Sequence, residues 1–189
     1  MFIKYIENFL TDEECDTLIS IGSSNNLTQM KSSLVVNGKV LEENVDYNGN
    51  KRMGCYFVDE LLEILLIKNL SNKIIELSNK LNPFNGVIYN GIPKYSFNRY
   101  GDGDFLDWHP DSHEIINGAT ITCIIQLNDD YNNGEIKYKI DDVTYLVNKK
   151  KGSLFMFDSN IVHSVGMVTN GFRYSMNVWP SKIIKKSLI

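Results

Sequence analysis

From Val87 onward the chain is a series of short apolar runs, each rich in β-branched or aromatic residues and each closed by a turn signal. Pairs such as Asn117-Gly118 and Asn170-Gly171 supply the turns. Many short strands after an initial helical block favour helices packed against an antiparallel sandwich or barrel. We expect strands over residues 94–100, 105–109, 120–128, 135–140, 143–147, 153–157 and 172–179.

The first part of the chain instead has helical patterns. Thr11 followed by Glu14 is a capping box, so a helix should begin at this point. Apolar residues at mostly helical spacing predict a second helix over residues 59–82, and Asn82-Pro83 should end it.

A polar segment, residues 23–54, separates the two predicted helices. It contains Asn37-Gly38 between apolar residues, a strong signal for a β-hairpin. A long polar hairpin outside the core is either a decorative insertion or a lid over a site. We expect a single domain over residues 1–189, with helical support and the hairpin at about 1–86 and the β core at about 87–180.

The composition disfavours several classes of protein. No run reaches the ~18 uninterrupted apolar residues of a membrane helix, and the acidic start of the chain is unlike a signal peptide. A formal net charge of −4 disfavours nucleic-acid binding. The three cysteines form no Cys-x-x-Cys pair, so neither a disulfide framework nor a thiolate zinc site is expected. We therefore expect a cytoplasmic protein with reduced thiols.

His109-Pro110-Asp111 is the first candidate for chemistry. Residues i and i+2 of an extended chain point to the same face, so His109 and Asp111 can offer a nitrogen and a carboxylate to one ion. Pro110 opposes the helical alternative, in which His109 and His113 would form a zinc-binding pair. Taken alone the tripeptide is weak evidence, because a histidine in a turn or at a sheet edge is the commoner case.

His163 and Arg173 are the other candidates. His163 follows an apolar strand and a short polar turn, as a ligand arriving from a neighbouring strand would. Arg173 lies in the last predicted strand, where a period of two places Ser175 and Trp179 on its face. A buried arginine is costly unless it meets an anion, so Arg173 indicates an anion site or, more plainly, an edge-strand ion pair.

Two histidines and one carboxylate on one face of a metal leave coordination positions open for a co-substrate and dioxygen. This set is the facial triad of non-haem Fe(II) oxygenases, although manganese or cobalt would accept the same donors. A structural zinc site would instead close its coordination shell, usually with thiolates. His109, Asp111 and His163 are therefore the predicted metal ligands and catalytic centre.

In the order of its motifs the chain resembles the prolyl 4-hydroxylase-type 2-oxoglutarate/Fe(II) dioxygenases. A Tyr-x-x-Gly element before the His-x-Asp motif is similar to residues 100–103, and a central strand ending in Leu-Asn is similar to residues 121–128. A Lys-Lys-Gly-Ser turn, a distal histidine and Gly-x-Arg-Tyr recur as residues 150–153, His163 and residues 171–174. Each piece is common, but the ordered set spans almost the whole chain and is specific.

This resemblance implies a cupin-like double-stranded β-helix, or jelly-roll, with iron at its mouth. It implies that Arg173 pairs with the distal carboxylate of 2-oxoglutarate, and that ascorbate serves as a reductant. The reaction would use dioxygen to hydroxylate a prolyl or other residue of a peptide or protein, with release of succinate and CO₂. A hydroxylase of a free amino acid or other small molecule, a zinc hydrolase and a non-catalytic metal-binding jelly-roll module are the alternatives.

Four further residues are expected near this site. Relatives often place a tyrosine where this chain has Gln126, whose side chain can reach the same carboxylate or be purely structural. Tyr100 is the other expected co-substrate contact. His113 is expected to face solvent or to support a ligand, and Arg52 can belong to a lid that meets the substrate.

Overall fold

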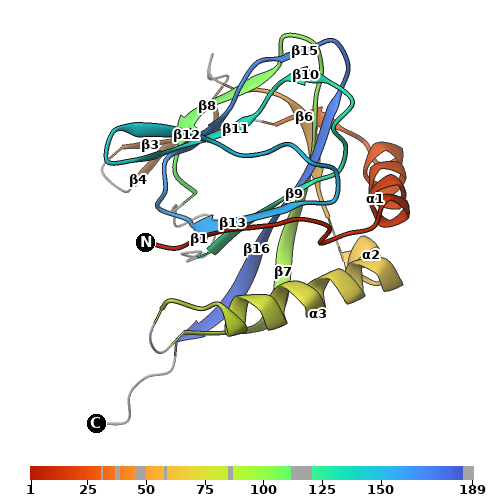
Figure 1. The fold of residues 1–189 in the computed structure, drawn as a ribbon, viewed down its shortest axis with the longest axis vertical. Coiled ribbons are helices and arrows are strands. Elements are labelled where there is room, and N and C mark those ends of the chain that lie inside the picture. Colours follow the sequence, from red (N-terminus) through yellow and green to blue (C-terminus); the bar gives the residue numbers. More distant parts are fainter. Residues whose placement is uncertain are drawn as a thin grey trace.

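The strands of the computed structural model form two facing antiparallel sheets and two short ladders (Figure 1). The structure describes residues 1–30, 32–36, 39–45, 50–57, 59–84, 87–111 and 121–184. The helices are α1 (Asp12–Ser24), α2 (Asp59–Leu62) and α3 (Leu65–Lys80). The strands are β1 (Ile3–Ile6), β2 (Thr28–Gln29), β3 (Ser32–Val36), β4 (Lys39–Val45), β5 (Asn50–Lys51), β6 (Met53–Tyr56), β7 (Val87–Tyr100), β8 (Phe105–His109), β9 (Ile121–Gln126), β10 (Asn132–Asn133), β11 (Ile136–Ile140), β12 (Val143–Leu146), β13 (Leu154–Asp158), β14 (His163–Val165), β15 (Val168–Thr169) and β16 (Arg173–Ile184).

The chain passes repeatedly from one sheet to the other. The larger sheet has the order β1-β13-β9-β16-β7-β6-β2 and the smaller has β12-β11-β14-β8-β5. Going along the sequence, β8, β11 and β14 join the smaller sheet, whereas β9, β13 and β16 join the larger. This alternation gives a jelly-roll, so the predicted fold class, mainly β with N-terminal helices, is confirmed.

Helix α1 begins where the capping box predicts. Thr11 Oγ1 accepts a hydrogen bond from the Glu14 amide at 3.2 Å, and Glu14 Oε2 accepts one from the Thr11 amide at 2.9 Å. Gly22 lies so close to the ring of Phe97 that a Cβ there would overlap it. The helix therefore packs tightly on the outer face of the larger sheet.

The predicted helix over residues 59–82 is wrong in one respect, because the chain breaks it into α2 and α3. The break falls at residues 63–64, where the Ile64 amide donates to the Leu61 carbonyl at 3.2 Å. Helix α3 then buries Ile67, Leu70 and Ile74 against the larger sheet.

Strand alternation gives the larger sheet an apolar outer face and an inner face on which buried polar residues lie beside an apolar cluster that includes Ile124, Phe155 and Phe157. On β7, Tyr95 and Phe97 join the core beneath the helices, whereas Ser96, Asn98 and Tyr100 are buried on the other side. So many buried polar residues on an inner face are unusual for a sandwich, whose facing sheets normally form an apolar core. The neighbouring strands contribute to this inner face Thr122, Ile124 and Gln126 from β9, and Arg173, Ser175, Asn177 and Trp179 from β16.

The hairpin predicted around Asn37-Gly38 is present as the β3–β4 ladder, in which Val36 pairs with Lys39. The two turn residues lie outside the described residues. Whether the segment 23–54 serves as a lid stays a prediction, as does the single domain over the whole chain.

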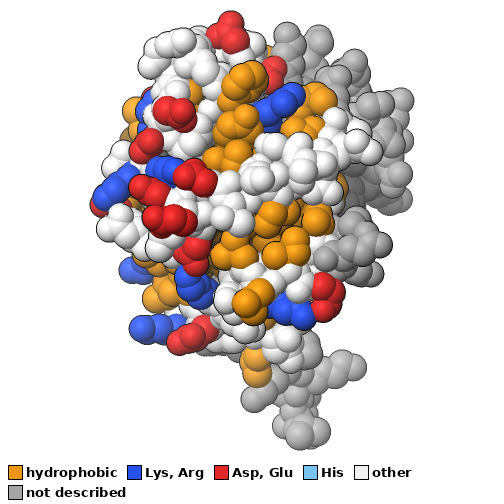
Figure 2. Space-filling view, turned by 90° about the vertical axis from the view of Figure 1, so that its right-hand side faces the viewer, with side chains coloured by type: hydrophobic (Ala, Val, Ile, Leu, Met, Phe, Trp, Pro, Cys, Tyr) orange, Lys and Arg blue, Asp and Glu red, His pale blue; other side chains and the backbone are white. Residues whose placement is uncertain are grey.

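Charged side chains of both signs share the surface. On the face shown in Figure 2, lysine and arginine side chains lie among aspartate and glutamate side chains. Two lysines of the 149–151 run form ion pairs, Lys150 with Glu7 at 2.9 Å and Lys151 with Asp16 at 2.6 Å. Within the described part of the chain, no helix has both the length and the apolar surface needed to cross a membrane.

Candidate metal and co-substrate site

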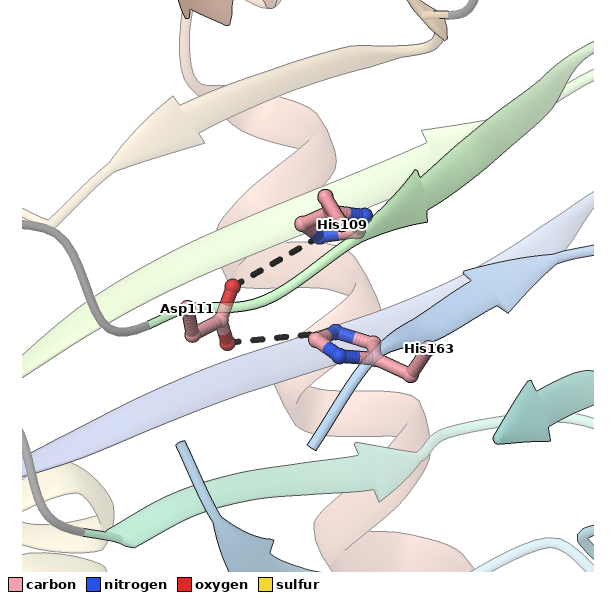
Figure 3. A group of neighbouring side chains, drawn as sticks. All are labelled: His109, Asp111 and His163. Carbon is pink, nitrogen blue, oxygen red and sulfur yellow. Dashed lines mark ion pairs between the residues drawn. The ribbon is translucent and has the colours of Figure 1, made fainter. Parts of the chain in front are cut away.

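Two histidines face each other across neighbouring strands of the smaller sheet (Figure 3). His109 is the last residue of β8, His163 is the first residue of β14, and the register pairs them directly. Their ring centroids lie 4.3 Å apart. The pairing of two strand ends therefore brings together residues that are far apart in the sequence.

Both imidazoles are fixed in the same tautomer. His109 Nδ1 lies 2.7 Å from the Asp107 carbonyl oxygen, and His163 Nδ1 lies 3.0 Å from the Ile161 carbonyl oxygen. A carbonyl can only accept, so each Nδ1 carries the proton and donates it. In the neutral ring each Nε2 then carries the lone pair with which a histidine binds a metal.

Asp111 completes the group. Its Oδ1 lies 3.5 Å from Nε2 of His109 and its Oδ2 lies 3.9 Å from Nε2 of His163, so one small ion can reach all three residues. The carboxylate is buried and held by two donors of the larger sheet, Thr122 Oγ1 at 3.0 Å and Trp179 Nε1 at 3.2 Å. This donor set of two nitrogens and one oxygen fits Fe(II).

Burial and neighbouring charge set the ionisation of these groups. Burial alone would raise the pKa of Asp111, but the charge of His163 and the hydrogen bond to His109 hold that pKa well below its usual range. Burial lowers the pKa of His163 to about 4, against the opposing effect of Asp111. At neutral pH the carboxylate is ionised and His163 is neutral, the forms in which both can bind a metal.

The buried neutral His163 predicts a loss of stability in acid for the metal-free protein. Because its folded pKa of about 4 lies below the ordinary 6.5, the unfolded chain takes up the proton first as the pH falls. The stability that neutral His163 contributes is fully present above pH 6.5 and is lost as the pH falls from 6.5 to about 4. We expect the free energy of unfolding to fall by ~3 kcal/mol over this pH range.

Urea unfolding of the chelator-treated protein at both ends of this window measures the effect. His163→Gln should lack that part of the acid destabilisation. Both proteins carry the same carboxyl groups, so the difference between their pH profiles isolates the histidine. Equal pH dependence in the two proteins would contradict the assignment.

Arg173 is a buried cation without a carboxylate partner among the described residues. Its side chain is 1% exposed, and Nη1 donates to Ser175 Oγ at 2.9 Å. Within the described residues Nε and Nη2 are buried with no acceptor. An unpaired buried charge costs several kcal/mol, so these donors fit an anion that the polypeptide does not supply.

Tyr100 lies between two arginines on the inner face. The Arg173 guanidinium carbon is 5.1 Å from the centre of the Tyr100 ring. On the other side, Arg52 Nη1 donates to the Tyr100 hydroxyl at 3.4 Å. Tyr100 thus contacts Arg173, and Arg52, which lies between β5 and β6, reaches the Tyr100 hydroxyl. The predicted contact of Tyr100 with the co-substrate stays a prediction.

Gln126 points to the inner face but its amide nitrogen is already engaged. Nε2 donates to the Asn128 carbonyl at 2.6 Å and to the Tyr131 hydroxyl at 2.8 Å. Burial raises the pKa of Tyr131, while the nearby Arg173 acts to lower it. These contacts favour the structural alternative for Gln126, and a direct contact with the co-substrate stays a prediction.

The structure therefore brings the predicted residues into two groups, the triad and the Tyr100–Arg173 pair. His113 lies outside the described residues. Sequence reasoning missed Tyr131, which follows β9 in a loop and has no distinguishing signal. It also missed the donors to Asp111, although the period of two on β16 already placed Trp179 on the face of Arg173.

Comparison with known proteins finds one matching family model. Residues 95–181, which contain the triad and Arg173, match the model of the 2OG-Fe(II) oxygenase superfamily. The β half of the chain is therefore similar to this superfamily. The predicted enzyme class, a 2-oxoglutarate-dependent dioxygenase with Fe(II) and 2-oxoglutarate as cofactors, is confirmed. No curated protein is significantly similar to the oxygenase in sequence.

Solved structures share the fold of the oxygenase over nearly its full length. A prolyl-4-hydroxylase of Pseudomonas putida is 15% identical with a TM-score of 0.71, over 94% of this chain and 91% of that one. The viral collagen prolyl hydroxylase of Paramecium bursaria Chlorella virus-1 is 18% identical, with a TM-score of 0.68 and 95% of each chain covered. A prolyl hydroxylase of Trichoplax adhaerens is 19% identical with a TM-score of 0.75, over 94% and 82%.

Proposed function

We propose that the oxygenase hydroxylates a prolyl residue of a peptide or protein substrate. His109, Asp111 and His163 bind Fe(II), and Arg173 binds the distal carboxylate of 2-oxoglutarate. When bound, Fe(II) and 2-oxoglutarate supply the oxidation, in which dioxygen is consumed and succinate, CO₂ and a hydroxylated substrate are released.

The observation that carries this proposal is the buried Arg173 beside the triad. Nε and Nη2, which have no acceptor among the described residues, match a carboxylate, since a guanidinium binds a carboxylate through two parallel hydrogen bonds. Arg173 and Trp179, the donor to Asp111, share one face of β16, so the anion site and the metal site lie on the same inner surface. A dicarboxylate with a keto-acid end fits such a surface.

Tyr131 adds a further donor to this anion site. Gln126 Nε2 also donates to a carbonyl, which fixes its amide orientation, so the Tyr131 oxygen must accept from it. The hydroxyl proton of Tyr131 is then free to donate, and the residue lies close to Arg173. We infer that Tyr131 donates to the same 2-oxoglutarate carboxylate.

Tyr131→Phe is therefore expected to weaken the binding of 2-oxoglutarate by ~1.5–3 kcal/mol, the range for a hydrogen bond to a charged group. Anaerobic titration of the metal-loaded protein with 2-oxoglutarate measures it. Tyr145→Phe, on the exposed strand β12, is the matched control. An unchanged dissociation constant for Tyr131→Phe would remove this residue from the site.

The substrate class rests on the shared fold with prolyl hydroxylases. The Trichoplax enzyme was solved with a peptide fragment of the hypoxia inducible factor oxygen degradation domain, and the viral enzyme was solved with 2-oxoglutarate. We infer a peptide substrate for this chain, a single domain over residues 1–189 and a cytoplasmic location. The location is supported by three free cysteines, of which Cys15 and Cys123 are buried.

The test is anaerobic addition of Fe(II) and 2-oxoglutarate to the purified apo-protein. A visible metal-to-ligand charge-transfer band is expected, because the keto acid must bind the metal directly. Oxygen should then convert 2-oxoglutarate to succinate, and peptides can be screened for stimulation. A folded protein that binds metal without this band would favour the zinc-hydrolase or binding-module alternative. Ascorbate dependence is measured in the same assay.

A further inference from the structure

Arg52 occupies the corner where the chain passes from one sheet to the other. Lys51, the last residue of β5, pairs with Phe105 of the smaller sheet. Met53, the first residue of β6, pairs with Arg99 of the larger sheet. Arg52 is the one residue between these strands, and its carbonyl accepts from the Met30 amide at 3.0 Å. Its backbone is therefore fixed at the border of the inner surface.

The side chain of Arg52 points inward. Because Met53 pairs with Arg99, Arg52 stands opposite Tyr100, and its Nη1 donates to the Tyr100 hydroxyl at 3.4 Å. Its Nε is buried and has no hydrogen-bond partner among the described residues. No described carboxylate lies within ion-pair distance of the guanidinium, so this cation is unmatched within that part of the chain.

Among the described residues, the charge count of the loaded site leaves one guanidinium unmatched. The charges of a divalent ion and of the 2-oxoglutarate dianion cancel, and Asp111 balances one guanidinium. In the sheet, β7 with Tyr100 lies between β16 and β6. Arg173 on β16 and Arg52 next to β6 therefore approach Tyr100 from opposite sides. A dicarboxylate held by Arg173 therefore leaves the positive charge of Arg52 at the border of the loaded pocket.

We propose that Arg52 is a specificity-determining residue that binds a carboxylate of the substrate. The inference rests on the proposed function, since it concerns what the loaded oxygenase accepts next. The class of substrate is a prolyl peptide with a carboxylate near the hydroxylated residue. That carboxylate belongs either to an acidic side chain or to the C-terminus of the peptide.

Pools of short peptides test the proposal on the iron-loaded full chain. Each peptide has one proline among glycine and alanine residues, and both of its ends are capped. The first three pools carry a single Glu, a single Gln or a single Lys, which is placed in turn at each position flanking the proline. A fourth pool has no charged side chain but keeps a free C-terminal carboxylate. The readouts are stimulated release of labelled CO₂ from 2-oxoglutarate and, under nitrogen, perturbation of the charge-transfer band.

The wild type should prefer the Glu pool or the free-carboxylate pool to the Gln pool by about tenfold or more, and whichever of the two wins identifies the source of the carboxylate. Arg52→Gln should remove the preference, and Arg52→Glu should favour the Lys pool. The control is Arg99→Gln. Arg99 lies on the neighbouring strand β7 and stacks on Phe172, so this variant should keep the preference.

The outcomes separate this inference from the proposed function. Absence of the charge-transfer band in the wild type would mean that the proposed function itself has failed. If the band forms but the pools are equal, or none stimulates, the role of Arg52 is overturned. The role is also overturned if Arg52→Gln weakens 2-oxoglutarate binding as much as the loss of Arg173 does. Thermal unfolding of each variant verifies that it folds.

Discussion

Replacing Asp111 with alanine is expected to abolish Fe(II)-dependent consumption of 2-oxoglutarate and to remove the charge-transfer band. The variant keeps the two imidazoles but loses the anionic donor that lies within reach of both. Losing a residue that only supports a metal ligand typically costs about 10–100-fold in affinity or activity, and loss of the ligand itself should exceed this. Succinate formation measured with excess Fe(II) gives the rate.

Asp107→Ala is the matched control for this experiment. Asp107 is an exposed carboxylate on β8, and its backbone carbonyl, which orients His109, survives the substitution. The control should retain the band and the turnover. Undiminished turnover in Asp111→Ala would refute the proposed ligand set.

Arg173→Ala is expected to act on the co-substrate rather than on the metal. Removing one partner of a desolvated charge pair costs ~2–5 kcal/mol, so the dissociation constant for 2-oxoglutarate should rise accordingly. Binding of Fe(II) or Mn(II) alone should persist, because the triad remains. Titration of the charge-transfer band with 2-oxoglutarate measures the loss.

The fold should survive the loss of Arg173. Its guanidinium is buried with two nitrogens that have no acceptor in the described chain, so the substitution removes an unfavourable charge from the apo-protein. Arg99→Ala, on the outer side of β7 beside Phe172, controls for a general effect of charge. Equal affinity of Arg173→Ala and wild type for 2-oxoglutarate would exclude Arg173 from the site.

Local patterns predicted much of this molecule because they act over a few residues. The capping box fixed the start of α1, and the alternation of apolar residues located β8 and most of β9, β13 and β16. The same alternation placed Arg173 and Trp179 on one face. Such features depend on backbone geometry, which the sequence records directly.

Other features depend on contacts between distant segments. The break between α2 and α3 has no glycine or proline to mark it, and the apolar run from Leu61 to Leu66 reads as continuous helix. The short strand β1 was not expected, because it exists only through its pairing with β13. Tyr131 lies near Arg173 because the loop after β9 carries it there, and no local sequence pattern predicts the course of that loop.

The position of Asp111 between the sheets has a consequence for the protein in a cell. Its backbone continues from β8 of the smaller sheet, but its carboxylate accepts hydrogen bonds from Thr122 and Trp179 of the larger sheet. An ion bound by both histidines and Asp111 joins the two halves of the sandwich, and its binding energy adds to that of folding. Iron scarcity would then shorten the lifetime of the polypeptide against proteases as well as silence its chemistry.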